Sequence, residues 1–244
     1  MALIVIPARM GAQRLPGKPL LAETGKPLVV HTLEAARRAR RAKRVVVATD
    51  DERIAQAVRA AGGEAVMTSP SCRSGTDRVA EAVRAVPGEE IIVNLQGDEP
   101  EIEPAHLDSL IEVMEREPSI PMGTLAAPLG SEAEAQAPSV VKVVADAAGF
   151  ALYFSRAAIP FRRDPAGPAP SFRHIGVYAF RRGFLAEFTA LPETPLERTE
   201  MLEQLRALEN GRRIRVVTVD RAPPGIDTRE DYEAFVRRRR ERSG

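Results

Sequence analysis

The amino-acid sequence predicts an α/β protein with a mostly parallel central sheet and an antiparallel addition in its second half. Through the first half, short β-branched runs alternate with amphipathic helical patterns, as expected for a parallel sheet covered on both faces. Beyond Pro118, strand-like segments follow one another without a full helix between each pair, which favours antiparallel pairing.

The first half is expected to form a doubly wound unit. Its expected strands are residues 3–6, 44–49, 64–67 and 90–95, and its expected helices are residues 27–40, 51–62 and 76–86. In such a unit the ligand binds beyond the carboxyl ends of the strands. The loop that follows the first strand is therefore the first place to search for a site.

The second half is expected to contain strands, a loop and two helices. The strands are predicted at residues 123–129, 140–146, 149–155, 173–180 and 214–219. Residues 162–171 are rich in proline and glycine and are predicted to form a mobile loop. One helix is predicted over residues 197–210, ended by Gly211, and another over residues 228–240. We expect residues 1–244 to form a single domain with halves 1–117 and 118–244.

Composition excludes several classes of protein. The chain has 35 basic and 34 acidic residues and a net charge of +1, so no global field favours nucleic acid or an anionic membrane. The arginines near the carboxyl end complement the dipole of a helix more simply than they bind nucleic acid. The lone Cys72 cannot form an internal disulfide, and no run approaches the roughly 20 apolar residues of a membrane span. We therefore expect a cytoplasmic protein without nucleic-acid or membrane partners.

The loop "IPARMGAQRLPGKPL" carries two glycines and three cations, Arg9, Arg14 and Lys18. It is not a Walker A loop, because its glycine spacing is one residue longer and Pro19 replaces the hydroxyl residue. Proline lacks an N–H group, and we expect that no helix begins at Lys18. The pattern favours a different loop that wraps a triphosphate, the alternative being a surface loop with scattered charge.

Two carboxylates are candidates for a divalent cation. In "IIVNLQGDEP", Asp98 follows the expected strand and should lie at the same sheet edge as the cationic loop, where it could hold a metal ion. Alternatively, it is a plain turn residue. Asp227, in "PPGIDT", follows the last expected strand. Alternatively, Asp227 or Thr228 only caps the last helix.

Other polar segments carry weaker signals. In "CRSGTDR", residues 72–78, Ser74 or Thr76 could cap a helix, or the loop could read the edge of a nucleotide base. Strand alternation places His174, Gly176 and Tyr178 on one face, which suits a hydroxylated ligand or a half-exposed strand.

A second pair of polar residues lies on the helix expected over residues 197–210. Glu200 and Gln204 are spaced by one helical turn, while Met201, Leu205 and Leu208 would form its core stripe. Such a pair can be merely solvated, so it counts only with other support.

Taken together, these segments resemble the 3-deoxy-manno-octulosonate cytidylyltransferases over essentially the whole chain. The resemblance rests on "PARMGAQRLPGKPL", "VVVATDDERIAQAV", "SGTDRVAE", "IIVNLQGDEP", "VKVVADAAGFALYFSRAAIP", "RHIGVYAFRRGFL", "PLERTEMLEQLRALENG" and "GIDTREDY". The ordered set is much more specific than any one segment.

The resemblance implies a Rossmann-like nucleotidyltransferase fold that transfers CMP from CTP to the anomeric hydroxyl of 3-deoxy-D-manno-octulosonate (Kdo). The products would be CMP-Kdo, for lipopolysaccharide biosynthesis, and pyrophosphate. It also implies Mg²⁺, a homodimer formed through the antiparallel addition, a nucleotide-binding half 1–117 and a sugar-binding and dimerisation half 118–244.

The resemblance also implies roles for individual residues. Arg9 and Lys18 would bind the triphosphate and stabilise charge at the α-phosphorus, and Arg14 would assist. Asp98 and Asp227 would hold Mg²⁺. The residues implied to seat the cytidine are Ala8, Ser74 and Gly75. Those implied to surround the sugar acid are Gln96, Arg156, His174, Tyr178, Glu200 and Gln204, with Arg156 a partner for its carboxylate.

Three features depart from relatives. Ala12 stands where a serine is common, Arg229 stands where a proline is common and could loosen the turn that holds Asp227, and the loop 162–171 is shorter than in some relatives. Two alternatives remain open. One is a cytidylyltransferase for a related sugar acid, of the 8-amino-Kdo or sialic acid type. The other is an inactive nucleotide-sugar-binding module on the same fold.

Overall fold

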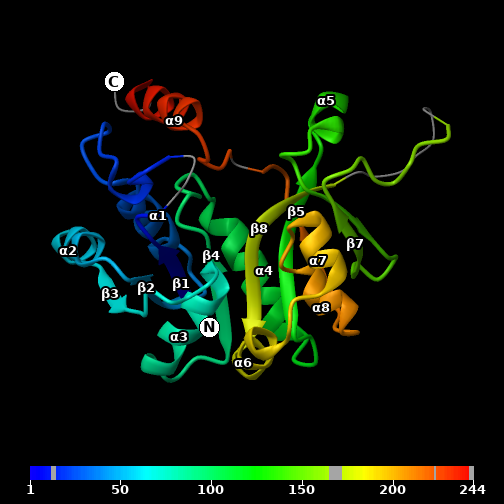
Figure 1. Cartoon of the computed structure of the whole chain (residues 1–244), viewed down its shortest axis with the longest axis horizontal. Helices are drawn as coiled ribbons and strands as arrows, with labels where there is room; N and C mark the ends of the chain where they lie inside the picture. The colour runs from blue at the N-terminus through cyan, green and yellow to red at the C-terminus, as the bar shows by residue number, and fades with distance from the viewer. Residues whose placement is uncertain (12–14, 165–171, 223, 242–244) are drawn as a thin grey trace. The chain divides into compact units, whose positions relative to one another are not determined.

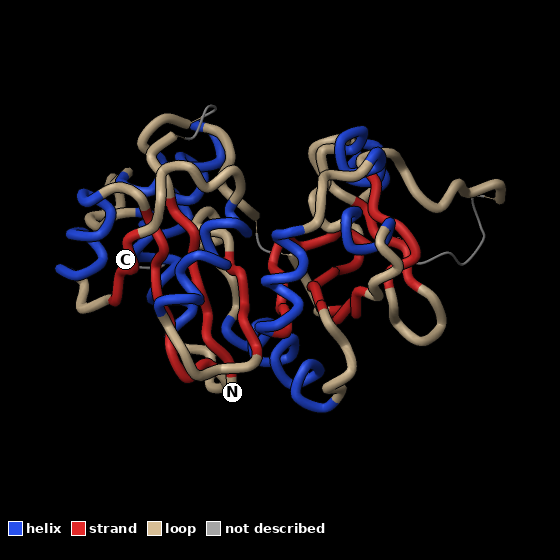
Figure 2. Tube along the Cα trace, turned by 60° about the horizontal axis from the view of Figure 1, so that its bottom comes forward, coloured by secondary structure: helices blue, strands red, loops and turns tan. Residues whose placement is uncertain are grey.

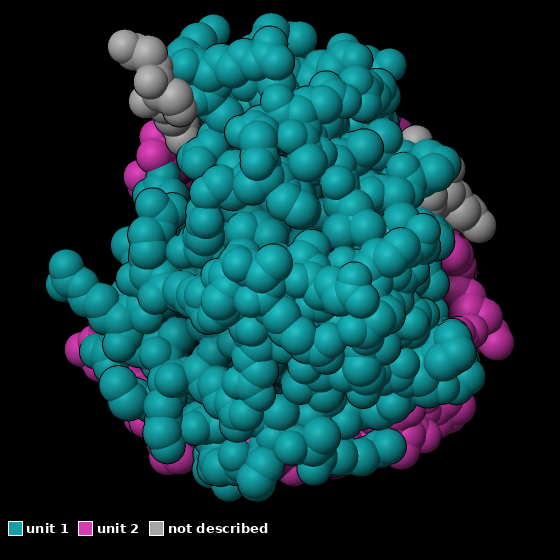
Figure 3. All heavy atoms as spheres, turned by 90° about the vertical axis from the view of Figure 1, so that its left-hand side faces the viewer, with its two compact units in different colours: residues 1–111, 223–244 teal, residues 112–222 magenta. Residues whose placement is uncertain are grey.

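The computed structural model describes residues 1–11, 15–164, 172–222 and 224–241. The chain divides into two compact units (Figure 3), of which unit 1 contains residues 1–111 and 223–244 and unit 2 contains residues 112–222. The chain passes from unit 1 to unit 2 within the helix α4 (Pro104–Arg116). The described residues contain no helix with the length and hydropathy that crossing a bilayer would need.

Unit 1 contains the predicted parallel sheet, with strand order β3-β2-β1-β4 (Figure 1). Its strands are β1 (Ala2–Ala8), β2 (Ala42–Thr49), β3 (Glu64–Met67) and β4 (Ile91–Leu95). Every residue of β1 and β4 is buried, because both faces of these strands are covered. Burial on both faces thus explains why the sequences of these strands are continuous apolar runs.

Unit 1 also contains helices, most of which connect its strands, while the last one ends the chain (Figure 2). They are η1 (Lys18–Leu20), α1 (Leu28–Arg37), α2 (Glu52–Ala60), α3 (Gly75–Ala85) and α9 (Arg229–Glu241). The side chain of Asp51 accepts a hydrogen bond from the first turn of α2, and the side chain of Ser74 does the same for α3. Of the two caps considered for α3, Ser74 is therefore the one used.

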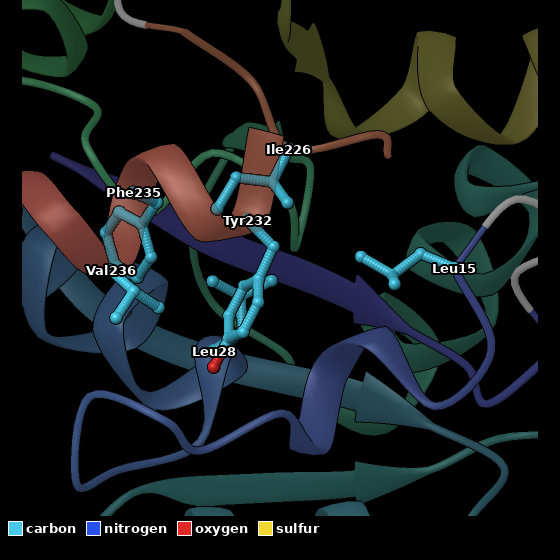
Figure 4. Close-up of a cluster of buried hydrophobic side chains, with 6 residues drawn as sticks. All are labelled: Leu15, Leu28, Ile226, Tyr232, Phe235 and Val236. Carbon is cyan, nitrogen blue, oxygen red and sulfur yellow. The ribbon is translucent and has the colours of Figure 1, made fainter. Parts of the chain in front are cut away.

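The carboxyl-terminal helix α9 packs in unit 1 through one apolar cluster (Figure 4). Side chains from α9 and from the segment before it meet side chains from the opening loop and from α1. The cluster contains Leu15, Leu28, Ile226, Tyr232, Phe235 and Val236. The division predicted at residue 117 placed residues 223–244 with the second half, whereas this burial brings them into the unit that contains β1.

Unit 2 contains the antiparallel strands predicted for the second half. The strands are β5 (Met122–Pro128), β6 (Lys142–Ala145), β7 (Ala151–Ser155), β8 (Phe172–Arg181) and β9 (Ile214–Thr218). β8 pairs antiparallel with β5 and β6, β6 pairs antiparallel with β7, and β9 lies parallel to β5. The remaining helices of this unit are α5 (Glu132–Gln136), α6 (Arg182–Ala190), α7 (Pro195–Glu200) and α8 (Leu205–Glu209).

The single helix predicted over residues 197–210 is wrong, because α7 ends at Glu200 and α8 begins at Leu205. Met201 takes a left-handed conformation, with φ 54°, and its side chain is exposed. The expected core stripe through Met201 is therefore absent, although Leu205 is buried. A buried ion pair between Glu197 and Arg206, with Nε of Arg206 2.9 Å from the carboxylate, holds the two short helices together.

Candidate functional site

The opening loop ends in a short turn that places Lys18. Gly17 has φ 70°, a left-handed conformation that glycine adopts at no steric cost, and the turn of 3₁₀-helix η1 begins at Lys18. The expectation that no helix could begin there is wrong for so short a turn. Pro19 lies in the first turn, where its missing N–H group costs nothing.

The ammonium group of Lys18 joins the two carboxylates predicted for metal binding. Its Nζ lies 2.7 Å from Oδ2 of Asp98 and 3.7 Å from Oδ1 of Asp227. It also donates a hydrogen bond of 2.8 Å to the carbonyl oxygen of Ile226. Lys18 is largely buried, with 14% of its side chain exposed, so these contacts take place in partial shelter from water.

Asp98 is placed by a close approach between the ends of β1 and β4. A Cβ atom at Gly97 would lie 3.0 Å from the carbonyl oxygen of Pro7, so this position favours glycine. The hydroxyl of Thr32 on α1 donates to the carbonyl of Gly97 at 3.0 Å, which fixes the turn. Asp98 therefore stands beyond the carboxyl ends of the central strands, as predicted.

Asp227 is held beside Asp98 by the backbone. The N–H group of Ile226 donates to the carbonyl oxygen of Asp98 at 3.0 Å. Helix α9 is capped by Thr228, whose side chain accepts from the N–H group of Asp231, while Oδ2 of Asp231 accepts from the N–H group of Thr228 in return. Of the two residues considered as the cap, Thr228 is thus the one used, and the carboxylate of Asp227 faces Lys18.

Arg229 does not loosen this turn. Its guanidinium lies 2.7 Å from Glu23 and 3.0 Å from Glu233, so it links the loop after η1 to the first turns of α9. The backbone N–H group of Glu23 also donates to the hydroxyl of Tyr232 at 2.9 Å. These contacts oppose the loosening that we expected of an arginine at this position.

The two carboxylates suit a divalent metal ion. Oxygen atoms of Asp98 and Asp227 converge on the same ammonium group, which shows that both face one position for a cation. Mg²⁺ takes oxygen ligands, and in nucleotide enzymes it uses one or two carboxylates together with phosphate oxygens. The donor set therefore fits Mg²⁺ with a bound triphosphate.

These residues line one cavity of about 440 Å³ in unit 1. Eight of the residues predicted from the sequence meet there: Ala8, Arg9, Lys18, Ser74, Gly75, Gln96, Asp98 and Asp227. Gln96 lies with the residues predicted for the nucleotide, because it directly follows β4. Arg14 and Ala12 fall outside the described residues.

The wall of the cavity near α3 is polar and closely packed. A Cβ atom at Gly75 would lie 3.4 Å from Oε1 of Gln96 and 3.4 Å from Pro7, so the start of α3 approaches both strand ends. Nε2 of Gln96 donates to Oδ1 of Asn94 at 3.0 Å, and Asn94 in turn donates to Thr76 at 3.2 Å. The amide of Gln96 is thereby oriented from within the sheet.

Arg78 also lines the cavity and was missed in the sequence. Its side chain is 2% exposed, and its guanidinium donates to Thr68 at 2.6 Å and to Asp50 at 2.9 Å. The one available signal was the placement of Asp50 immediately after β2, at the same sheet edge as Asp98. A buried arginine on the apolar side of α3 requires a carboxylate partner at that edge.

In unit 2, Arg156 and Glu200 form one of two groups of predicted residues. The N–H group of Arg156 donates to Oε2 of Glu200 at 2.9 Å, and its Nε donates to the carbonyl of Glu200 at 2.8 Å. Glu200 also accepts from Ser155 at 2.6 Å and from Tyr153 at 3.4 Å. Burial acts to raise the pKa of Glu200, but these hydrogen bonds together hold the pKa below its usual value.

The second group is formed by His174, Tyr178 and Gln204. The rings of His174 and Tyr178 lie 5.4 Å apart, and the hydroxyl of Tyr178 donates to Oε1 of Gln204 at 3.0 Å. His174 is buried against Thr124, at 2.9 Å, and burial lowers the pKa of His174 to about 3. The imidazole is therefore neutral at physiological pH.

Gln204 leaves one polar atom unsatisfied. Its side chain is 3% exposed, and Nε2 has no hydrogen-bond partner among the residues that the structure describes. A buried amide nitrogen without a partner is costly, and a hydroxylated ligand could satisfy it. Burial also raises the pKa of Tyr178, so that its phenol stays protonated and remains a donor.

Comparison with known proteins identifies the family. A family model described as cytidylyltransferase matches residues 3–214. The 3-deoxy-manno-octulosonate cytidylyltransferase of Anaeromyxobacter sp. strain K is 55% identical over 232 residues, which are 94% of this chain and 94% of that protein. The chain belongs to the 3-deoxy-manno-octulosonate cytidylyltransferase family.

Other members and a solved structure agree. The cytidylyltransferase of the same name from Syntrophotalea carbinolica is 50% identical over 235 residues, covering 93% of this chain and 94% of that one. A solved structure of CMP:2-keto-3-deoxy-manno-octonic acid synthetase complexed with CTP superposes with a TM-score of 0.94 at 45% identity and covers 99% of both chains. A cytidylyltransferase from Leptospira borgpetersenii, at 20% identity and a TM-score of 0.64, shares the fold.

Family membership confirms the predicted nucleotidyltransferase fold and the resemblance seen in the sequence. As a cytidylyltransferase, the chain carries the predicted nucleotide-binding residues that the structure describes, Ala8, Arg9, Lys18, Ser74 and Gly75, in one cavity of unit 1. The roles of the individual residues remain predictions that rest on this geometry.

Proposed function

We propose that this cytidylyltransferase transfers CMP from CTP to Kdo and releases pyrophosphate. The observation that supports it most strongly is the meeting of Lys18, Asp98 and Asp227 at the cavity of unit 1. That meeting brings a phosphate-binding cation and two metal-binding carboxylates to one place. The relatives at 50 to 55% identity are named for the same reaction.

In the proposed reaction, the anomeric oxygen of Kdo forms a bond to the α-phosphorus of CTP. The bond from that phosphorus to the oxygen bridging to the β-phosphate breaks, pyrophosphate leaves with that oxygen, and the hydroxyl proton passes to water. Arg9 and Lys18, with Arg14, bind the triphosphate and stabilise the charge that develops on it. Ala8, Ser74 and Gly75 seat the cytidine, because they line the same cavity.

Asp98 and Asp227 would hold Mg²⁺, which neutralises phosphate charge when it is bound. Lys18 contacts both carboxylates, and with a cation held by Asp98 and Asp227 its ammonium would be available to the phosphates. The contribution of the protein is then largely positioning and charge neutralisation.

The sugar acid is assigned to Arg156, His174, Tyr178, Glu200 and Gln204 of unit 2. Arg156 supplies the cation for the acid's carboxylate, since buried His174 is neutral. Gln204 supplies the unsatisfied amide nitrogen for a hydroxyl group. Glu200 fixes the backbone and guanidinium of Arg156.

The test is pyrophosphate release measured with CTP, UTP, ATP and GTP against Kdo, 8-amino-Kdo and a sialic acid, with and without EDTA. We expect release from CTP with Kdo only, and its loss when the metal is chelated. A preference for another acid would favour the related-acid alternative. If CTP binds measurably but no acid gives turnover, the result would favour the alternative of an inactive nucleotide-sugar-binding module.

We also propose that the protein is a homodimer that works in the cytoplasm in lipopolysaccharide biosynthesis. Unit 2 exposes large apolar side chains, among them Leu152, Phe161 and Met201, with exposed fractions of 63%, 88% and 76%. Exposed apolar groups on one unit favour burial against a second copy. Light scattering of the wild type and of Phe161→Ser tests this, and a monomeric wild type would contradict it.

A further inference from the structure

Lys142 is the first residue of β6 and is fully buried. Among the described residues, no carboxylate lies within ion-pair distance of it. Its ammonium instead donates to three backbone carbonyls, those of Ala137 at 3.0 Å, Val140 at 2.6 Å and Arg156 at 2.5 Å. Three donors thus meet three acceptors, which satisfies every hydrogen-bonding proton of the group.

A buried cation without a carboxylate partner is costly. Burial lowers the pKa of Lys142, and the positive charge of Arg156 lowers it further, while Glu200 acts in the opposite direction. An apolar residue here would avoid the burial of a charge but would leave three carbonyls without their donor. The role of the ammonium should therefore be sought in the three carbonyls that it binds.

The three carbonyls belong to the two segments that support the Arg156 guanidinium. One carbonyl is that of Arg156 itself, which directly follows β7. The other two flank Pro138, whose carbonyl accepts from Nη1 of Arg156 at 3.1 Å. Lys142 therefore holds the backbone of Arg156 and also the segment to which its guanidinium is bonded.

The guanidinium keeps one nitrogen for another partner. Nε donates to the carbonyl of Glu200 and Nη1 donates to that of Pro138, while Nη2 has no hydrogen-bond partner among the residues that the structure describes. A fixed guanidinium with an available nitrogen is prepared to bind an oxyanion.

We propose that Lys142 is a positioning residue for the sugar acid: it fixes Arg156 so that the guanidinium meets the acid's carboxylate. This inference rests on the proposed function, in which Arg156 binds that carboxylate. Lys142 touches no substrate itself, and its positive charge beside Arg156 adds to the field that attracts an anion.

Lys142→Met keeps the length of the side chain and removes the ammonium. We expect the KM for Kdo to rise about tenfold or more and the KM for CTP to stay within about twofold, because misplacement affects only the group that Lys142 holds. In an Arg156→Gln background, Lys142→Met should produce no further rise in the KM for Kdo, because the group that it positions is already absent.

Arg181 offers a matched control in the same unit. Its guanidinium also binds backbone carbonyls, those of Met114, Glu117 and Ile120, at the opposite end of β8. We expect both Arg181→Met and Lys142→Met to lower the melting temperature, because each leaves backbone carbonyls without a donor, but Arg181→Met should change neither KM selectively. If both variants shift the two KM values alike, the role of Lys142 is only structural and the proposal fails.

Lys142→Gln, which keeps N–H donors for the carbonyls, is the second variant if Lys142→Met does not fold. We expect a smaller rise in KM that is again confined to Kdo, and equal KM values for wild type and this variant would overturn the proposal. A wild type that releases no pyrophosphate with any acid would contradict the proposed function instead. The two failures are therefore distinguishable.

Discussion

Lys18 and Asp98 form an ion pair, with Nζ 2.7 Å from Oδ2, at the end of the central sheet. The same ammonium lies 3.7 Å from Asp227. The protein thus carries its own cation at the position where two carboxylates face each other. A metal ion that binds these carboxylates must compete with Lys18.

This competition gives a prediction for metal binding. Lys18→Met should bind Mn²⁺ more tightly than the wild type does in the absence of nucleotide, because two carboxylates lose their counter-ion. The same variant should lose about a hundredfold or more of its turnover, since a cation at the phosphates is gone. Electron paramagnetic resonance of free Mn²⁺ measures the first effect. Unchanged Mn²⁺ affinity would show that Lys18 does not share the carboxylates with the metal.

Each carboxylate should be required for turnover. Asp98→Asn and Asp227→Asn keep the shape of the side chain but remove its charge, and we expect each to lose about a hundredfold or more of pyrophosphate release. Asp51→Asn is a matched control, because Asp51 caps α2 and asparagine is an equally good cap. Retained turnover in Asp227→Asn, with an unchanged melting curve, would remove that residue from the metal site.

The apolar cluster under α9 should couple stability to nucleotide binding. Phe235 is fully buried, and Phe235→Ala should lower the free energy of unfolding by about 3–5 kcal/mol. It should also weaken CTP binding, since the cluster contains Leu15 and Ile226, which flank the Lys18 site. Urea unfolding and calorimetric titration with CTP measure the two effects.

Tyr232→Phe is the milder variant for comparison. It removes one hydroxyl that accepts from the N–H group of Glu23, and about 1 kcal/mol is the expected loss. A Phe235→Ala protein that is destabilised yet binds CTP as the wild type does would disprove the coupling.

Stability should fall in mild acid because of His174. Burial lowers the pKa of His174 in the folded protein to about 3, from an ordinary value of 6.5, so below that ordinary value the unfolded chain binds a proton that the folded protein does not. Stability from this residue is therefore complete above about pH 7 and is lost as the pH falls toward 3. At pH 5 the loss amounts to about 2 kcal/mol.

His174→Gln isolates this effect, because glutamine does not titrate and can still bond Thr124. The difference in unfolding free energy between wild type and variant should shift by about 2 kcal/mol against the wild type from pH 7.5 to pH 5. Parallel pH curves for the two proteins would contradict the assignment. His31, with a pKa lowered to about 4 mainly by burial, acts in the same direction in both proteins.

Periodicity in the sequence predicted most of the fold, because β1, β2 and β4 are apolar runs covered on both faces and the helices between them are amphipathic. It also predicted the place of Asp98 beyond the ends of the central strands, since its position after a buried strand determines the sheet edge. The break at Met201 was not predictable, because residues 197–210 contain no glycine or proline and keep a helical pattern. The ion pair between Glu197 and Arg206, which joins the two short helices, stabilises the broken conformation of that segment.

Other features depend on contacts that leave no pattern. Lys142 binds backbone carbonyls, which every residue possesses, so no complementary side chain in the sequence indicates its role. Arg78 pairs with Asp50 across a long stretch of chain. The return of α9 to unit 1 depends on a cluster whose members come from both ends of the chain.

The origin of Asp227 has a consequence for the order in which the protein matures. Unit 2 is inserted in the chain between the two parts of unit 1, so Asp227 and Ile226 leave the ribosome only after the whole of unit 2. The strands of unit 1 can pair early. Until Ile226 and Asp227 have been synthesised, however, Lys18 has Asp98 as a partner and lacks the other two. A nascent or truncated chain would thus hold a formed sheet with an unfinished site, and nucleotide chemistry would await completion of the polypeptide.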